Sequence, residues 1–543
     1  MKVITRPRQL PDLNSLFNSG WLQHQQGKLP EAQAIYEEVL SKQPTHSEAL
    51  HLLGIIALDS SNPTLAIDLI TRSIESHPDN AAAYASLGKA LNAISQPDEA
   101  INCYNTAISL RPNFAEVYYN KANLLQFLNR LDEAVISYDL AIEHHPQNAG
   151  AYCNKGQALF KLGRLQDAID SYDLAISLKN DHSDAYLGRG LALFGLNQID
   201  DAIDSYNSAI NLNPKCAEAY WNKSIALLIT GNYSEGWQNY EWRWKLKDFK
   251  SQKRNFTQPT WLGKECLHNK IILLYAEQGL GDIIQFSRFT EKIKEMGAMV
   301  LLESPKELIN LFKTLKGVDQ LIKFGTPLPS FDYQCPLMSL PLALNLTIDN
   351  IPFSEGYLSS DSQSLNKWNL LLGRKVKPRL GIAWSGNKDH KNDRARSLKL
   401  SEIIGYLPQE FECISLQKEI REYDNVIFEQ SDIKHYGEYL ENFSDTASLC
   451  ELMDVIISVD TSVAHLAGAL GKKTCILLPF QGDWRWLFDC QKIDSPWYKT
   501  VKLYRQDQKK EWPPVLTVLK HDLQSLAIDL KNTSIHWCSF SAA

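Results

Sequence analysis

The residues best suited to chemistry lie in the stretch SVDTSVAH, residues 458–465. An apolar run, LMDVIISV, leads into Asp460, Thr461 and Ser462, and small apolar residues then resume at helical spacing. This order predicts a buried strand, a polar turn and the first turn of a helix. The first N–H groups of a helix have no intrahelical partner, and the helix dipole favours negative charge there. The triplet therefore predicts an anion site, and we expect the anion to be a diphosphate.

His465 lies one turn after Thr461 on the same helical face, so we expect it near the bound anion. The alternative is that Asp460 or Thr461 simply caps the helix. Capping would account for one residue of the triplet and would leave His465 unexplained.

A second polar cluster, WSGNKDHKNDRARS, follows the apolar run RLGIAW. If both runs are strands of one parallel sheet, this cluster and the triplet meet at the same carboxyl edge. A guanidinium there would neutralise a leaving diphosphate, and we assign that role to Arg396. The alternative is a solvated basic loop. The other candidates in the cluster are Asn387, Lys391, Asn392 and Arg394.

A third motif, LLYAEQGLGDIIQF, ends another apolar run. Gly279 and Gly281 permit a tight strand-to-helix turn, and Asp282 is expected at the helix start, facing the crevice at the sheet edge, with Gln285 one turn further on. A dinucleotide site is a rival, with Glu303 in the place of a ribose-binding acid, but Ile284 replaces the third glycine that it needs. Asp282 as a plain helix cap is the other alternative.

Short apolar runs alternate with amphipathic segments from Lys270 onwards. The runs are IILLYA, MVLLES, RLGIAWS, FECISLQ, DVIISV and TCILLP, and this alternation predicts parallel sheets covered by helices. We expect a linker at 248–268, α/β blocks at 269–360 and 376–505, and a last helix at 515–531.

The first half of the chain repeats every 34 residues, because prolines stand at 44, 78, 112, 146 and 214. Each unit pairs a small residue, such as Gly20 or Gly88, with an alanine twelve positions later and usually a tyrosine four further on. Two antiparallel helices can approach closely at these points. The pattern resembles the tetratricopeptide repeat and predicts an α-solenoid at 13–247, with six full repeats and a divergent seventh that docks as a cap.

Asn120, Asn154 and Asn222 occupy one recurring slot of these repeats. An asparagine can bond both a backbone N–H and a C=O, so the row is suited to holding an extended polypeptide. The alternative is that they are polar surface residues. Lys121, Lys155, Arg189 and Lys223 stand beside them, either as a solvated face or as a grip for acidic partners.

The composition excludes several classes of protein. The formal net charge is −7 without a long Lys/Arg block, which argues against a nucleic-acid partner. No run of 18 apolar residues occurs, the stretch MKVITRPRQLPDLNSLF lacks the apolar core expected of a signal peptide, and the ten cysteines form no C-x-x-C pair. We therefore expect a cytoplasmic protein with reduced thiols, no membrane span, no metal and no cofactor.

Residues 270–530 are similar to the ADP-heptose:lipopolysaccharide heptosyltransferase family in GLGD and in DTSVAH, which matches the family's D-T-G-x-x-H. The resemblance implies a GT-B fold: two Rossmann-like domains, the donor nucleotide on the second, and a final helix that crosses back. It also implies inverting transfer without a metal, in keeping with the absence of a D-x-D triplet, and it makes Asp282 the catalytic base. The chain departs from the family at Ser462, where the family has glycine, and in the HKNDRARS loop.

Repeats joined to such a half resemble bacterial tetratricopeptide-repeat glycosyltransferases, some of which modify flagellin, and distantly O-linked N-acetylglucosamine transferase. The resemblance implies transfer from a nucleotide-sugar to a polypeptide held by the repeats, such as flagellin or another secreted or surface protein. Two alternatives stay open: a lipid-linked or polysaccharide acceptor with the repeats as a docking module, and a non-catalytic scaffold with a decayed transferase half.

Overall fold

The computed structural model describes residues 12–249, 254–389, 393–488 and 493–540. The chain divides into two compact units, Met1–Pro214 and Lys215–Ala543. Among the described residues, none of the helices is both long and apolar enough to cross a membrane.

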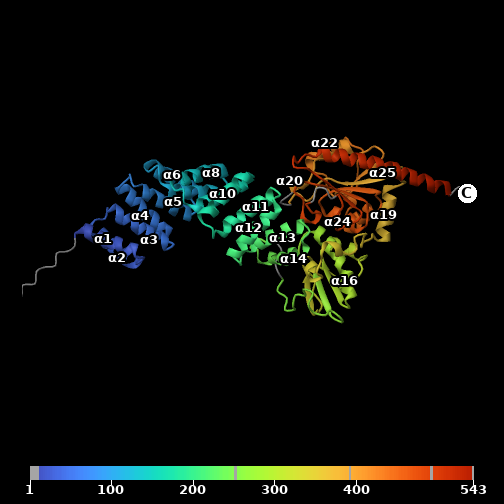
Figure 1. The fold of residues 1–543 in the computed structure, drawn as a ribbon, viewed down its shortest axis with the longest axis horizontal. Coiled ribbons are helices and arrows are strands. Elements are labelled where there is room, and N and C mark those ends of the chain that lie inside the picture. The colour runs from blue at the N-terminus through green and yellow to red at the C-terminus, as the bar shows by residue number, and fades with distance from the viewer. Residues whose placement is uncertain (1–11, 250–253, 390–392, 489–492, 541–543) are drawn as a thin grey trace, which may run out of the picture. The chain divides into compact units, whose positions relative to one another are not determined.

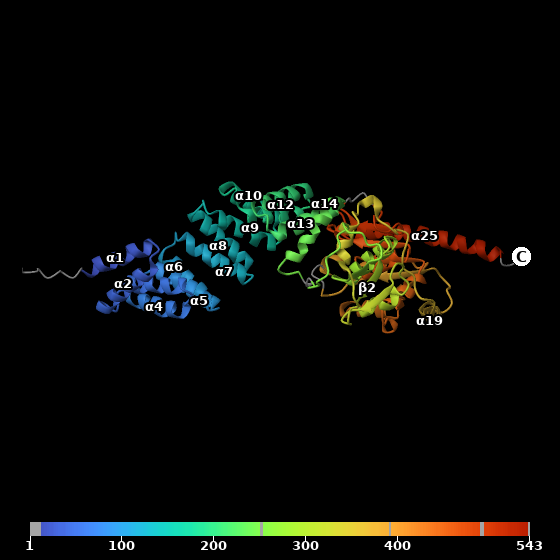
Figure 2. The same ribbon diagram turned by 90° about the horizontal axis from the view of Figure 1, so that it is seen from below.

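The first unit is a row of antiparallel helix pairs, which Figures 1 and 2 show in blue to green, one pair after another. Proline begins some of the second helices, as at Pro63 and Pro97, where its missing N–H costs no helical hydrogen bond. The helices are α1 Leu13–Gln25, α2 Leu29–Lys42, α3 Ser47–Asp59, α4 Pro63–Ser76, α5 Ala81–Ala93, α6 Pro97–Leu110, α7 Ala115–Phe127, α8 Leu131–His144, α9 Ala149–Lys161, α10 Leu165–Leu178, α11 Ser183–Gly195 and α12 Ile199–Leu212. The predicted α-solenoid is confirmed.

The small residue of each repeat makes room for a large side chain of the next helix. A Cβ added to Gly88 would lie 2.6 Å from Cε1 of Tyr104, and one added to Gly190 would lie 2.5 Å from the same atom of Tyr206. Both tyrosines are buried. The repeat pattern of the sequence is therefore the packing pattern of the solenoid.

The seventh pair opens the second unit, where α13 (Ala217–Ile229) and α14 (Tyr233–Tyr240) lead into η1 (Glu241–Lys245). Trp237 is 1% exposed and meets Trp484 edge to face, with ring centroids 5.2 Å apart. Tyr233 stacks on Trp497 at 5.8 Å. The divergent repeat thus packs on the α/β part through aromatic side chains, as expected of a docking cap.

The first α/β part contains a parallel sheet of order β3-β2-β1-β4. Thr260, in the segment expected to be a linker, forms an isolated bridge with Gln334 of β4. The elements are β1 Ile271–Tyr275, α15 Leu280–Phe286, α16 Thr290–Glu295, β2 Met299–Ser304, α17 Lys306–Phe312, β3 Gln320–Lys323, β4 Tyr333–Pro336 and α18 Leu340–Ala343. The next helix, α19 (Ser362–Leu372), packs on α23 (Phe443–Glu451) of the second α/β part.

The second α/β part contains a larger parallel sheet of order β10-β9-β8-β5-β6-β7. Chain order reverses between β5 and β8, which makes their carboxyl ends the topological switch point where open α/β sheets bind ligands. The elements are β5 Arg379–Ala383, α20 Asp393–Arg396, α21 Leu400–Ile403, β6 Glu412–Ser415, α22 Asn425–Glu429, β7 Lys434–His435, α23 Phe443–Glu451, β8 Val455–Val459, α24 Ser462–Ala469, β9 Thr474–Leu478, η8 Trp484–Trp486 and β10 Val501–Arg505.

The last helix, α25 (Pro513–Phe540, red in Figure 1), packs on this larger sheet. Its buried Leu516, Leu519 and Leu523 share a hydrophobic cluster with β5, β8 and β9 residues, and Lys520 donates to the Gly405 carbonyl at 3.2 Å. The described part of α25 therefore covers the second sheet, and its predicted return to the first α/β part stays a prediction.

We predict that Gly88→Val destabilises the solenoid by about 1–3 kcal/mol, because the new side chain would overlap the Tyr104 ring. Ala93→Val, at an exposed position of the same helix, should change the unfolding free energy by less than about 0.5 kcal/mol. Urea unfolding followed by circular dichroism measures both. Equal stability of the two variants would contradict this account of the packing.

Candidate functional site

A cavity of about 640 Å³ lies at the carboxyl edge of the larger sheet. Its walls come from the loop after β5, the loop after β6 and the first turns of α23 and α24. Leu280 of α15 and Glu307 of α17 complete it from the first α/β part. The cavity therefore lies at the switch point that strand order defines.

The first turn of α24 faces this cavity through Thr461, Ser462 and Val463. Thr461 is the N-cap residue with extended backbone, but its side chain accepts no capping hydrogen bond, and its hydroxyl lies 3.3 Å from that of Ser458. The predicted strand, turn and helix start are all present. The alternative in which the Thr461 side chain caps the helix is not realised, and the Ala464 N–H of the first turn donates to the Thr461 carbonyl at 3.0 Å.

Arg396 joins the two polar loops predicted to meet at this edge. Its Nη1 donates to the backbone carbonyl of Asp460 at 2.9 Å, and its Nε is buried without a hydrogen-bond partner among the described residues. A Cβ on Gly386 would lie 2.7 Å from Nη2 of Arg396, so glycine makes room for the guanidinium.

The remaining candidates of the β5 loop differ in position. Asn387 lines the cavity, and its Oδ1 accepts the N–H of Asp389 at 3.0 Å. Arg394 is exposed and does not line the cavity. Lys391 and Asn392 lie outside the described residues.

Sequence reasoning missed Arg421, which lines the cavity and anchors the β5 loop. Its Nη2 donates to the Gly386 carbonyl at 2.8 Å and to Asp393 at 2.9 Å, and Ser397 donates to the same carboxylate at 2.7 Å. Burial alone would raise the pKa of Asp393, but the hydrogen bonds from Arg421 and Ser397 lower it. The sequence signal that could have found Arg421 is a cation shortly after the next strand, FECISLQ, at the same edge of the sheet.

The start of α15 packs directly against the start of α24. A Cβ added to Gly281 would lie 2.9 Å from Cδ2 of His465 and 3.4 Å from Cα of Ser462. The GLGD and DTSVAH motifs therefore touch one another. At this position glycine permits close approach of two helices.

Both carboxylate oxygens of Asp282 accept hydrogen bonds. Oδ2 accepts the N–H of the N-cap residue Gly279 at 2.9 Å, and Oδ1 accepts a hydrogen bond from Nη2 of Arg485. The side chain is 21% exposed. Arg485 also donates from Nε to Oε1 of Gln285 at 2.7 Å, so the predicted site residue Gln285 contacts this arginine.

His465 occupies the core, which corrects the expectation that it lies beside the anion. It is 5% exposed, its Nδ1 lies 3.1 Å from the Tyr498 hydroxyl, and its ring stacks on Trp486 with centroids 5.2 Å apart. Burial holds its pKa well below the usual range, with Arg485 and Arg288 adding to the effect. We assign His465 a packing role between α15 and α24.

Glu303, the acid considered for a dinucleotide site, is 1% exposed and forms an ion pair with Arg254. Its carboxylate is therefore already satisfied and buried, and it is poorly placed to bind a ribose hydroxyl.

The three asparagines of the row differ in their hydrogen bonds. Asn154 donates to Tyr119 and Asn123 at 3.1 and 2.9 Å, and Asn222 donates to the carbonyl of Glu218 in its own helix at 2.7 Å. Asn120 has a buried Nδ2 without a partner among the described residues. It lines a cavity of about 600 Å³ beside Phe127, which is 84% exposed. Asn120 is thus the member of the row best placed to bind a peptide.

Three of the four cations beside this row, all but Lys121, form ion pairs within the described part of the protein. Lys155 pairs with Asp139 at 2.6 Å, Arg189 with Asp173 at 2.8 Å and Lys223 with Glu235 at 2.5 Å. They are therefore poorly suited as a grip for acidic partners.

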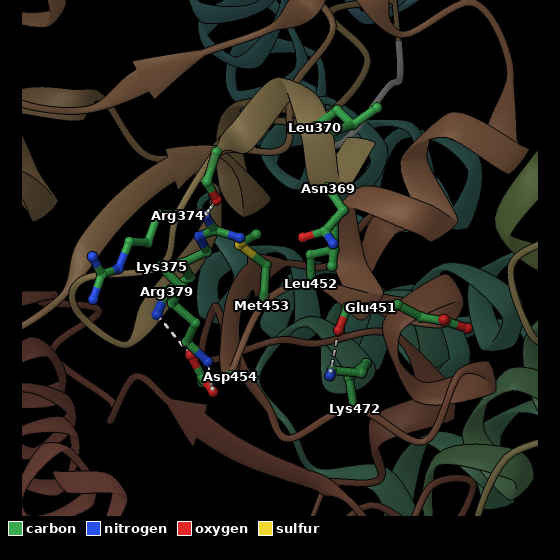
Figure 3. A pocket seen from close by; sticks show the side chains of 11 residues that line it. Asn369, Leu370, Arg374, Lys375, Arg379, Glu451, Leu452, Met453, Asp454 and Lys472 are labelled. Atoms are coloured by element: carbon green, nitrogen blue, oxygen red, sulfur yellow. Dashed lines mark hydrogen bonds and ion pairs between the residues drawn. The ribbon is translucent and has the colours of Figure 1, made fainter. Parts of the chain in front are cut away.

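A further cavity, of about 600 Å³, lies at the opposite, amino edge of the larger sheet (Figure 3). Its two lysines already have partners: Lys375 pairs with Asp454 at 2.7 Å, and Lys472 donates to the Glu451 carbonyl at 2.9 Å. The described helix residues in its lining come from the ends of α19 and α23, and not from a helix start.

We predict that Asp460→Asn raises the Tm at pH 7.5, and that the gain shrinks toward pH 4. Burial, with the nearby Asp483 carboxylate, raises the pKa of Asp460 to about 6, above its unfolded value of about 3.9. The folded state therefore binds this proton more tightly, and ionising Asp460 costs stability as the pH rises from about 4 to 6.

Thermal unfolding at several pH values measures the difference, with the exposed Asp389→Asn as a control that should leave the Tm nearly unchanged. A lower Tm for Asp460→Asn than for the parent protein at pH 7.5 would contradict the prediction.

Comparisons with known proteins agree with the repeat half. Models described as tetratricopeptide or TPR repeats match residues 23–91, 91–126, 119–185 and 183–216. Protein FlbA of Caulobacter vibrioides is 23% identical over 321 residues, 53% of this chain and 52% of that protein, so the match spans about half of the curated relative.

Solved structures with similar helix arrays have low TM-scores, which refer to the whole of this chain. YrrB, described as a TPR protein with an unusual peptide-binding site, has a TM-score of 0.32 at 16% identity and covers 34% of this chain and 95% of its own. PilF of Pseudomonas aeruginosa has a TM-score of 0.35 at 17% identity and covers 38% and 94%. Together with the helix pairs described above, the matched family models identify residues 23–216 as tetratricopeptide repeats, a protein-interaction module.

Proposed function

We propose that the protein is a glycosyltransferase that moves a sugar from a nucleotide-sugar to a hydroxyl of a polypeptide bound by the repeats. The observation that supports this most is the cavity at the switch point of the larger sheet, with the helix start Thr461–Ser462 in its wall and Arg396 behind it. Helix N–H groups and guanidinium groups are the donors that bind diphosphates in proteins.

The donor would lie with its diphosphate at the start of α24, within reach of Arg421, which follows β6 and donates to the β5 loop. Fixed donors at that point stabilise the negative charge that develops on a departing nucleoside diphosphate. Asp460, Thr461, Ser462 and Arg396 keep the donor-site role that the sequence predicts, while His465 supports them from the core.

The acceptor hydroxyl would approach from the α15 side, where Asp282 lies on the helix that packs against α24. In the proposed step, the acceptor oxygen forms a bond to the anomeric carbon, and its proton passes to Asp282. The bond from that carbon to the diphosphate oxygen breaks, and the leaving group keeps the electron pair. Attack from the face opposite the leaving group inverts the anomeric centre.

The presence of two parallel sheets supports assignment to the GT-B fold. The carboxyl edge of the larger sheet lines the cavity, and so does the start of α15, the helix that follows β1 of the smaller sheet. The switch-point order of the larger sheet supports donor binding on the second α/β part. No group of three or more candidate metal ligands occurs among the described residues, and transfer without a metal stays a prediction.

The repeats support a protein acceptor, because they form an interaction module with a groove lined by Asn120 and Phe127. A lipid-linked or polysaccharide acceptor, with the repeats as a docking module, is the second candidate. A non-catalytic scaffold is the third.

We predict that one class of ADP-, UDP-, GDP-, dTDP- or CMP-linked sugar raises the Tm of the protein. A ligand at 100 times its Kd adds about 2.7 kcal/mol to the unfolding free energy. The double variant Thr461→Ala/Arg396→Ala should lose most of this shift, because charged hydrogen bonds contribute about 1.5–3 kcal/mol each. Arg374→Ala, at the amino-edge cavity, serves as the control and should keep it. Absence of a shift with every nucleotide class would support the scaffold alternative.

We predict that deleting residues 1–214 abolishes transfer to protein but preserves slow hydrolysis of the donor. The boundary follows the compact units, since deletion to residue 244 would remove Trp237 and expose the aromatic cluster around Trp484.

In the full chain, Asp282→Asn should lower the transfer rate by about 10²–10⁴-fold.

Chromatography of the nucleotide product and mass spectrometry of the acceptor report both activities. Undiminished transfer to protein by the deletion variant would remove the repeats from acceptor binding. An unaltered rate for Asp282→Asn would remove Asp282 from the chemistry.

A further inference from the structure

Arg485 ties together residues that lie about 200 positions apart in the chain. Its Nε donates to Oε1 of Gln285 at 2.7 Å, its Nη1 to Oδ1 of Asp483 at 2.7 Å, and its Nη2 to Oδ1 of Asp282. The guanidinium also lies over the Trp484 ring, 4.2 Å from the centroid. Each guanidinium nitrogen therefore has a partner, and the orientation of the planar group is fixed.

These contacts cross from η8 of the second α/β part to α15 of the first. Arg485 is 6% exposed and Gln285 is fully buried, so solvent does not compete strongly for the hydrogen bonds. Both oxygens of the Asp282 carboxylate accept hydrogen bonds, one from Arg485 and the other from the Gly279 N–H. These contacts hold the carboxylate in one orientation.

We propose that Arg485 is a positioning residue for Asp282: it fixes the carboxylate against the start of α24, so that the base and the donor site keep one geometry. This inference rests on the proposed function. The planar guanidinium of Arg485 donates to three acceptors, on Asp483, Gln285 and Asp282. A lysine at this position would keep the charge but would lose that geometry.

The test compares Arg485→Lys and Arg485→Gln with Arg379→Lys in the full chain. Arg379 is a matched control, since it is 2% exposed and also holds several acceptors, including Glu412 at 3.1 Å and the Gly373 carbonyl at 2.8 Å, but it lies at the amino edge of the sheet. The measurements are kcat and donor KM for transfer or donor hydrolysis, and the Tm of each variant.

We expect the kcat of both Arg485 variants to fall by about 10- to 100-fold at nearly constant donor KM, because a small displacement of a reacting group costs rate and not donor binding. Arg485→Lys should retain more activity than Arg485→Gln. Arg379→Lys should lower the Tm and leave kcat unchanged.

An unchanged kcat in both Arg485 variants overturns the inference while the proposed function stands. A rise in donor KM at constant kcat also overturns it and makes Arg485 a donor-binding residue. A parent protein that neither transfers nor hydrolyses any donor overturns the proposed function, and the positioning role falls with it.

Discussion

The close packing of the start of α15 on the start of α24 is the contact on which the candidate site depends. It requires a glycine at 281, because any Cβ there would meet the His465 ring and the Ser462 backbone. Through this contact, the polar turn that follows β1 lies beside the polar turn that follows β8. The Asp282 carboxylate and the start of α24 therefore lie next to one another, as the proposed function requires.

Buried and partly buried charged groups gather around the same contact. Arg485 lies among Asp282, Asp483 and Gln285, and the pKa of Asp460 is raised to about 6 by burial and by Asp483. Taking such groups out of water costs stability unless each finds partners. Their concentration at one sheet edge is typical of sites where chemistry, and not stability alone, selects the residues.

The repeats are joined to this site by the seventh pair. Arg243 of η1 is fully buried and donates from Nη2 to Glu277, just beyond β1, at 2.8 Å and to Ser339 at 2.8 Å. Trp237 adds an aromatic contact with Trp484, the neighbour of Arg485. The last helix pair therefore belongs physically to the α/β unit, although its sequence continues the repeat.

The sequence by itself determined the elements: the 34-residue period predicts the helix pairs, and apolar runs that end in polar turns predict the parallel strands and the helix start at Thr461. Such features depend on neighbours in the chain, and local patterns record them. Only the tertiary structure decided which polar residues share a site. It placed His465 in the core, tied Asn154 and Asn222 into internal hydrogen bonds, and brought Arg421 and Arg485 to the cavity and to Asp282. Those outcomes depend on contacts between residues tens to hundreds of positions apart, for which the sequence carries no periodic signal.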